Sequence, residues 1–243
     1  MLETTWGFKS PLAHQNNTTK APGKPGAFFR SCPSKMSRYD RDMERSRPVV
    51  VFDLGEVLAS PDNLEAQLAD RAGTNEKAMN GAYWHNRLPH DEGLSADEYW
   101  TIVLADVGVE HSDRLVRDLV ALDTAAWMTI RPDAAELLAQ LHAVGTRVAI
   151  LSNMPAELAA QARHTAWAPY VDDWFFSGEM GVAKPAPEIY SRAAVSLAVD
   201  PAMIVFIDDR QVNVTAAIAA GWDAHLWTSD AATRALLSGL RFI

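Results

Sequence analysis

The sequence predicts an α/β fold with a parallel β-sheet core, covered by helices on both faces, and an inserted α-helical subdomain. Three observations lead to this prediction. Short apolar segments rich in β-branched residues alternate with longer segments of helical periodicity. The short apolar segments end in polar residues, as strands of a parallel sheet do where they reach a ligand site. One long stretch, residues 62–129, contains helical patterns and no clear strand.

The strands are expected in the short apolar runs. Val49–Phe52 follows Pro48 and ends at Asp53, which is typical of a strand buried on both faces. Four further candidate strands stop in the same way at polar residues: Arg147–Leu151, Trp174–Phe176, Met203–Ile207 and Ala224–Trp227. Because parallel strands point the same way, their carboxyl ends meet at one edge of a Rossmann-like sheet, where ligands bind in this architecture.

Helices are expected between these strands. The candidates share a 3.6-residue apolar period, and several have Pro at the start or Gly just past the end: Asp133–Val144, Ala156–Ala166, Ala186–Leu197, Val212–Ala220 and Ala231–Leu240. The insertion has four more: Asn63–Ala72, Glu76–His85, Ala96–Val107 and Ser112–Asp123. Its large side chains are more typical of a cap core than of a ligand box: Tyr83, Trp84, Tyr99, Trp100, Val103 and Trp127.

The predicted domain organisation has three parts. Residues 1–47 are rich in Pro, Ser, Asn, Lys and Arg and lack sustained periodicity, so we expect a disordered or extraneous N-terminal tail there. Residues 48–60 and 130–243 are expected to form the α/β core, and residues 61–129 the helical cap.

Composition narrows the classes of partner. No apolar run approaches the roughly 20 residues of a membrane-spanning helix, and the single cysteine, Cys32, suits a reducing compartment, so a cytoplasmic protein is expected. The formal net charge is −9; residues 1–47 contribute +5, which leaves −14 for the rest. An acidic body repels nucleic acid and anionic lipid, so neither is an expected partner. The oligomeric state is left open.

Two candidate groups of site residues combine a carboxylate or hydroxyl with a strand end. Asp53 begins the segment Asp-Leu-Gly-Glu directly after the first strand, and Ser152-Asn153 follows the second. Each has an ordinary structural explanation, since Asp, Ser and Asn are common turn and helix-cap residues. Hydroxyl, amide and backbone N–H donors at one sheet edge can also hold a phosphoryl group.

Two further groups supply the charges of a phosphate site. Lys184 lies between Ala183 and Pro185, where a rigid backbone can present its ammonium to a phosphate. Asp208-Asp209 follows a very apolar strand. Adjacent carboxylates repel each other unless a cation lies between them, and oxygen ligands of this kind suit Mg²⁺. The sequence therefore predicts a phosphate and Mg²⁺ site at this edge of the sheet.

Taken together, the four groups resemble the haloacid dehalogenase superfamily, in order and spacing, over Pro48–Trp227. The resemblance implies that Asp53 is the nucleophile, that Ser152 and Asn153 bind the phosphoryl group, and that Lys184 neutralises charge beside it. It further implies metal ligation by Asp53, the Gly55 carbonyl and Asp209, with Asp208 as a closer supporting group. Asn213 would orient the last loop. The helical insertion resembles the α-helical cap of that superfamily.

One position departs from the pattern of the family's phosphatases. Most of them carry a second Asp two residues after the nucleophile, which protonates the leaving oxygen, and Gly55 stands there in this chain. Loss of a general acid costs roughly 10²–10⁴-fold in rate. Water, a cap residue or Glu56 could supply the proton instead. Gly55 could also require a backbone conformation with positive φ.

The predicted function is Mg²⁺-dependent hydrolysis of a small phosphorylated metabolite, such as a sugar phosphate, through an aspartyl-phosphate intermediate. A 2-haloacid dehalogenase is an alternative, although such enzymes need no metal and have no use for Asp208-Asp209. A phosphomutase depends more directly on the missing acid. A binding protein that has lost turnover is the non-enzymatic alternative, and Gly55 is the observation in its favour.

Overall fold

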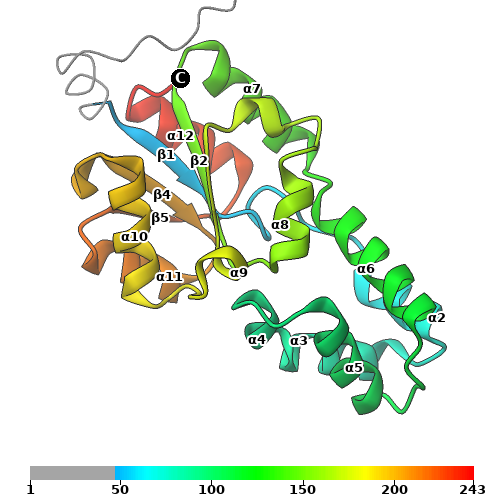
Figure 1. Cartoon of the computed structure of the whole chain (residues 1–243). Coiled ribbons are helices and arrows are strands. Elements are labelled where there is room, and N and C mark those ends of the chain that lie inside the picture. The colour runs from blue at the N-terminus through cyan, green and yellow to red at the C-terminus, as the bar shows by residue number, and fades with distance from the viewer. Residues whose placement is uncertain (1–46) are drawn as a thin grey trace, which may run out of the picture. The chain divides into compact units, whose positions relative to one another are not determined.

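A five-stranded parallel sheet forms the centre of the computed structural model, which describes residues 47–243 (Figure 1). The predicted N-terminal tail therefore lies outside the described residues except for Arg47. The strands are β1 (Val49–Phe52), β2 (Arg147–Ser152), β3 (Asp173–Phe176), β4 (Ile204–Asp208) and β5 (Asp223–Leu226). Their order in the sheet is β3-β2-β1-β4-β5, and every neighbouring pair is parallel. The predicted α/β class and parallel sheet are confirmed.

Alternate residues of the central strands face opposite sides of the sheet, as strand geometry requires. In β1, Val50 and Phe52 pack with one hydrophobic cluster, while Val49 and Val51 pack with another. All four are fully buried. β1 lies between β2 and β4, so Asp53, the residue that follows it, stands in the middle of the sheet's carboxyl edge.

Helices cover both faces of the sheet (Figure 1). One face packs against α7 (Pro132–Ala143), α8 (Ala156–Ala162) and α12 (Asp230–Gly239). The other packs against α10 (Pro187–Leu197) and α11 (Gln211–Ala219). Short elements complete the core: α9 (Ser177–Met180) and the 3-10 turns η1 (Ala168–Tyr170) and η2 (Pro201–Met203). α8 ends four residues before the predicted Ala166 because the chain turns there towards η1.

The insertion is helical, as predicted, and contains one helix more than expected. Its members are α2 (Leu64–Ala72), α3 (Glu76–His85), α4 (Arg87–Asp91), α5 (Ala96–Asp106) and α6 (Asp113–Trp127). α2 packs against α3 and α6, and α5 packs against α3 and α6. α6 runs one turn past the predicted end at Asp123 and carries Trp127 on its last turn. The limits 61–129 for the cap, and 48–60 with 130–243 for the core, stay predictions.

Most of the large cap side chains form the expected core. Tyr83, Tyr99, Trp100 and Val103 are fully buried and join the hydrophobic cluster on the α7 side of the sheet. Trp84 differs, because 47% of it is exposed. Its side chain is therefore available to a ligand, contrary to the predicted core role.

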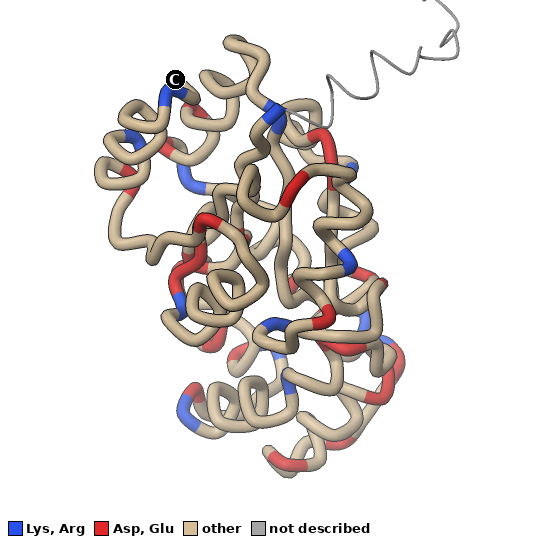
Figure 2. Tube along the Cα trace, turned by 90° about the vertical axis from the view of Figure 1, so that its left-hand side faces the viewer, with Lys and Arg blue, Asp and Glu red and all other residues tan. Residues whose placement is uncertain are grey.

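The described part of the chain is acidic, as expected from the sequence. Acidic residues outnumber basic ones along the tube in Figure 2. Within residues 47–243, the structure contains no helix that is both long enough and apolar enough to cross a membrane.

Candidate active site

Asp53 is held rigidly at the end of β1. Its backbone N–H donates to the carbonyl of Ile207 at 2.9 Å and so extends the pairing of β1 with β4. Its side chain is 10% exposed. The Oδ1 atom accepts from the Leu54 N–H at 2.7 Å and lies 3.0 Å from Lys184 Nζ. Both contacts engage the same oxygen.

Lys184 lies between two carboxylates. Its Nζ donates to Asp208 Oδ2 at 2.7 Å, to the Leu151 carbonyl at 2.8 Å, and contacts Asp53 Oδ1 at 3.0 Å. Burial acts to lower the pKa of this ammonium, but Asp53 and Asp208 raise the pKa above its usual value. The lysine is therefore charged and fixed beside the predicted nucleophile, as the sequence led us to expect.

Asn153 positions this lysine through two hydrogen bonds. Its Nδ2 donates to the Lys184 carbonyl at 2.9 Å, and its Oδ1 accepts from the Lys184 backbone N–H at 2.8 Å. The side-chain amide predicted to bind phosphate is thus engaged with the backbone of another segment. Ser152 ends β2, is buried, and lines the same cavity as Asp53.

The paired acids have different environments. Asp208 is fully buried and accepts from the Arg210 N–H at 2.8 Å, from Asn213 Nδ2 at 3.0 and 3.1 Å, and from Lys184. Asp209 is half-buried and lines the cavity. Asn213 thus bonds both oxygens of the Asp208 carboxylate, and its predicted role of orienting this loop stays a prediction. The arrangement leaves Asp209 as the more accessible acid of the pair.

Three carboxylates meet at this edge of the sheet. Asp53, Asp208 and Asp209 each offer an oxygen, and these oxygens lie within 4.8 Å of one another. Burial raises the pKa of Asp53 to about 7; Lys184 opposes the rise and Asp208 adds to it. Burial and then Asp208 raise the pKa of Asp209. A cation bound among these oxygens would relieve the repulsion, so the residues present fit a hard divalent metal ion.

The Gly55 loop has space where the missing acid would stand. The Gly55 carbonyl accepts from the Val57 N–H at 2.7 Å. A Cβ at Gly55 would lie 3.5 Å from the Trp127 ring, which is an ordinary contact. The expected positive φ is found one residue later, at Glu56, with φ of 58°. Glu56 Oε2 accepts from the Ser60 hydroxyl at 2.6 Å, on the rim of the site.

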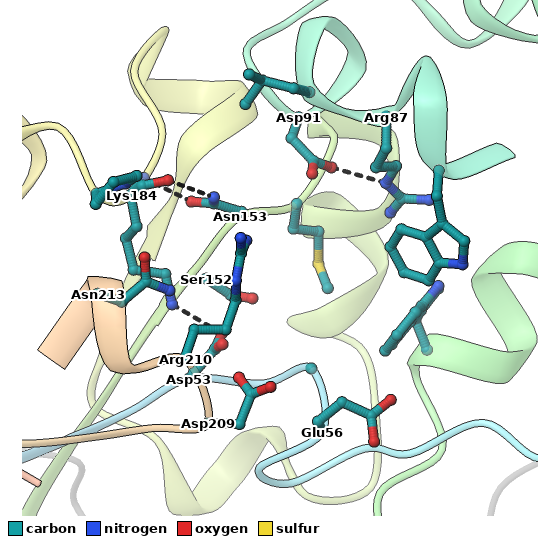
Figure 3. A pocket seen from close by; sticks show the side chains of 16 residues that line it. Asp53, Glu56, Arg87, Asp91, Ser152, Asn153, Lys184, Asp209, Arg210 and Asn213 are labelled. Atoms are coloured by element: carbon teal, nitrogen blue, oxygen red, sulfur yellow. Dashed lines mark hydrogen bonds and ion pairs between the residues drawn. The ribbon is translucent and has the colours of Figure 1, made fainter. Parts of the chain in front are cut away.

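All the predicted residues except Asp208 line one cavity of about 590 Å³, a size usual for small-molecule sites. Its floor comes from the strand ends, and its opposite wall comes from the cap (Figure 3). The lining also contains residues that were not predicted from the sequence to be site residues. They are Trp84, Arg87, Leu88, Asp91 and Trp127 from the cap, and Met154 and Arg210 from the core. The signal in the sequence that could have identified Arg87 and Asp91 is their spacing, because residues four apart lie on one face of a helix.

The cap wall is supported by a buried polar network. Arg87 Nε donates to Asp91 Oδ1 at 2.9 Å, and Arg87 Nη1 donates to Asp123 Oδ2 at 3.3 Å and to the Tyr83 hydroxyl. That hydroxyl in turn donates to Asp123 Oδ1 at 2.7 Å and accepts from Trp127 Nε1 at 3.0 Å. Burial raises the pKa of Asp91, while Arg87 opposes the rise. We call these five residues the cap network.

Comparison with known proteins places this architecture in a family. The family model for the haloacid dehalogenase-like hydrolases matches residues 48–221. The chain therefore belongs to the haloacid dehalogenase-like hydrolase family, as the resemblance of its motifs predicted.

Individual relatives carry both phosphatase and dehalogenase names. Phosphatase MT3486 of Mycobacterium tuberculosis is 29% identical over 76% of this chain and 89% of its own length. A crystal structure of a dehalogenase superimposes with a TM-score of 0.65 at 23% identity, over 79% of this chain and 97% of that one. A haloacid dehalogenase family enzyme from Bacteroides thetaiotaomicron, in complex with magnesium and inorganic phosphate, gives a TM-score of 0.59 at 22% identity, over 75% of this chain and 95% of that one.

Proposed function

We propose that this protein is a Mg²⁺-dependent phosphatase that hydrolyses a small phosphorylated metabolite, such as a sugar phosphate, through an aspartyl-phosphate intermediate on Asp53. The observation that carries the proposal is the position of Asp53. This carboxylate lies on the floor of a cavity, 3.0 Å from a buried lysine and beside two further carboxylates. The phosphatase name of the mycobacterial relative supports the same reaction.

In the proposed mechanism, Asp53 attacks the phosphorus atom. Its Oδ1 is engaged by Leu54 and Lys184, so Oδ2 is the oxygen that would form the new bond. As this bond forms, the bond between phosphorus and the leaving oxygen breaks, and that oxygen takes up a proton from water, a cap residue or Glu56. Water then attacks the aspartyl-phosphate, which releases inorganic phosphate and restores the Asp53 carboxylate.

The remaining floor residues would hold the substrate and the metal. Asp53, Asp209 and the Gly55 carbonyl would be the Mg²⁺ ligands, and Asp208 would support them from below while it fixes Lys184. When bound, Mg²⁺ would supply charge neutralisation for the phosphoryl group. Ser152, the neighbouring backbone and Lys184 would bind the phosphoryl oxygens, and the Asn153 side chain would act by holding Lys184 in place.

The dehalogenase alternative is the second candidate, because dehalogenase-named structures share this fold. That reaction needs an aspartate nucleophile but gives no role to Asp209, whose pKa is raised by burial and by Asp208. A carboxylate held in an unfavourable field and turned towards a cavity is expected where a cation binds.

Metal-dependent turnover of a generic substrate tests the proposal. We expect release of inorganic phosphate from p-nitrophenyl phosphate in the presence of Mg²⁺, and a loss of at least about 100-fold in excess chelator, because the metal neutralises developing charge. Restoration by added Mg²⁺ is the control for damage by the chelator. Full turnover in chelator, together with halide release from a 2-chloroacid, would favour the dehalogenase instead.

A further inference from the structure

The geometry points to Asp91 as the residue that selects the substrate, by accepting hydrogen bonds from the hydroxyl groups of a polyhydroxylated leaving group that carries no negative charge. This inference rests on the proposed phosphatase function. It assigns a role to the cap side of the cavity, whereas the family mechanism concerns the floor.

Asp91 and its partner Arg87 come from α4 and face the cavity from the side opposite Asp53 and Asp209 (Figure 3). A phosphoryl group attacked by Asp53 lies on the floor, so the leaving group must extend away from the floor towards the cap. Asp91 is therefore placed to meet the leaving group rather than the phosphate.

Asp91 has unused hydrogen-bonding capacity. Its Oδ1 accepts from Arg87 Nε at 2.9 Å, which fixes the orientation of the carboxylate. Among residues 47–243 no hydrogen-bond donor contacts Oδ2, and Oδ2 is not among the fully buried atoms that lack a partner. The Asp91 side chain is only 11% exposed, yet it lines the cavity with one oxygen that has no donor among these residues, so it can accept a hydrogen bond from a ligand.

The cap wall carries excess negative charge. An anionic leaving group would meet Asp91 with Asp123 behind it, two carboxylates against the single cation Arg87. The other arginine in the cavity lining, Arg210, lies on the side of Asp53 and Asp209. A neutral hydroxyl avoids the repulsion and donates to Oδ2, and an ammonium could donate there as well. Trp84 and Trp127 line the same wall and offer apolar surface to the carbon skeleton of such a group.

The test compares four monoesters of similar size in the wild-type enzyme with Mg²⁺. Glucose 6-phosphate carries hydroxyls, n-hexyl phosphate carries none, 6-phosphogluconate adds a carboxylate, and glucosamine 6-phosphate adds an amine. We expect kcat/KM for glucose 6-phosphate to exceed that of n-hexyl phosphate by at least about tenfold, as a site built to bond a hydroxyl discriminates strongly against analogues that lack it. The value for 6-phosphogluconate should also be lower, because the carboxylates of the cap wall repel its added charge. Glucosamine 6-phosphate, which can also donate to Oδ2, should be hydrolysed better than 6-phosphogluconate.

Asp91→Asn then tests the residue. We expect the preference for glucose 6-phosphate over n-hexyl phosphate to fall by about tenfold or more, and 6-phosphogluconate to improve relative to glucose 6-phosphate, because the variant removes one negative charge from the wall. Glu92→Gln is the matched control: it removes a charge at the next, exposed position, outside the cavity lining, and should keep the wild-type ratios.

The outcomes separate this inference from the proposed function. Equal kcat/KM for glucose 6-phosphate and n-hexyl phosphate, a preference for 6-phosphogluconate, or unchanged ratios in Asp91→Asn would overturn the role of Asp91 while leaving the phosphatase intact. No release from any ester, p-nitrophenyl phosphate included, would overturn both. The wild-type comparison decides the substrate class even if the variant fails to fold.

Discussion

The floor and the cap wall of the cavity use the same device, a buried cation between two carboxylates. On the floor Lys184 lies between Asp53 and Asp208, and in the cap Arg87 lies between Asp91 and Asp123. The floor cluster has Asp209 as an additional acid within reach of the others, whereas the cap network satisfies its acids with a tyrosine hydroxyl and a guanidinium.

The difference indicates a division of work. The floor carries more carboxylates than cations, and a bound metal ion would balance this excess negative charge. The floor is therefore suited to catalysis. The cap network is nearly complete without any ligand and leaves one acceptor open, so the wall is suited to recognition. The following variants test whether the two clusters are separable, from the largest expected effect to the smallest.

Asp53→Asn should reduce phosphate release by at least about 10³-fold, because it removes the proposed nucleophile at nearly constant volume. Phosphate release with circular dichroism as a check of folding is the measurement. If the variant keeps more than about a hundredth of the wild-type rate, Asp53 is not the nucleophile. The proposed division between a catalytic floor and a recognition wall would then fail.

Asp123→Asn should lower the free energy of unfolding by about 3 kcal/mol or more, because breaking a buried ion pair leaves Arg87 incompletely compensated. The control is Asp118→Asn, which breaks the pair with Arg71 at a site where both side chains are more than a third exposed. That exposed pair should contribute about 0–1 kcal/mol. Urea denaturation of both variants measures the two losses in the free energy of unfolding. If the two losses are similar, the cap network contributes little to the stability of the cap.

Stability should also depend on pH through Asp53. Its pKa is raised by burial to about 7 from an ordinary 3.8, so the folded protein retains a proton that the unfolded chain releases. The contribution of Asp53 to stability is complete below about pH 4 and is lost as pH rises through about 7. In chelator, Asp53→Asn should therefore raise Tm more at pH 8 than at pH 5, by a few °C for a domain of this size. An equal rise at both pH values would contradict the raised pKa.

The sequence predicted the floor better than the wall for a physical reason. Residues at the ends of buried parallel strands must meet at one edge, so Asp53, Ser152 and Asp208 could be placed together from apolar runs alone. Lys184 lies in the loop before α10, and the resemblance to the family placed it. Helix packing has no such rule. α4 spans only five residues and contains Pro89, too short for a periodic pattern, so Arg87 and Asp91 were not selected.

Close contacts between loops could also not be predicted from the sequence pattern. The Asn153 amide was predicted to hold phosphate, but it bonds the backbone of Lys184, 31 residues away. The neighbouring α9 was missed because its four residues carry no period. Its packing depends on Gly178, where a Cβ would lie 2.6 Å from the Ala156 backbone nitrogen.

The smallest expected effect concerns the proton for the leaving oxygen. If Gly55 leaves this protonation weak, aryl phosphates should be hydrolysed faster than alkyl phosphates, because a phenol departs with little proton assistance.

Gly55→Asp should then raise the rate on n-hexyl phosphate severalfold more than on p-nitrophenyl phosphate. The loop accepts a side chain here, since Gly55 has no positive φ and its Cβ would meet the Trp127 ring at 3.5 Å. The measurement is single-turnover phosphorylation across leaving groups of different pKa, on a variant with wild-type circular dichroism. If the wild-type rate is independent of leaving-group pKa, another group already protonates the leaving oxygen. Glu56→Gln is then the decisive variant, because Glu56 lines the cavity beside Gly55; an unchanged rate would assign the proton to water or to the cap.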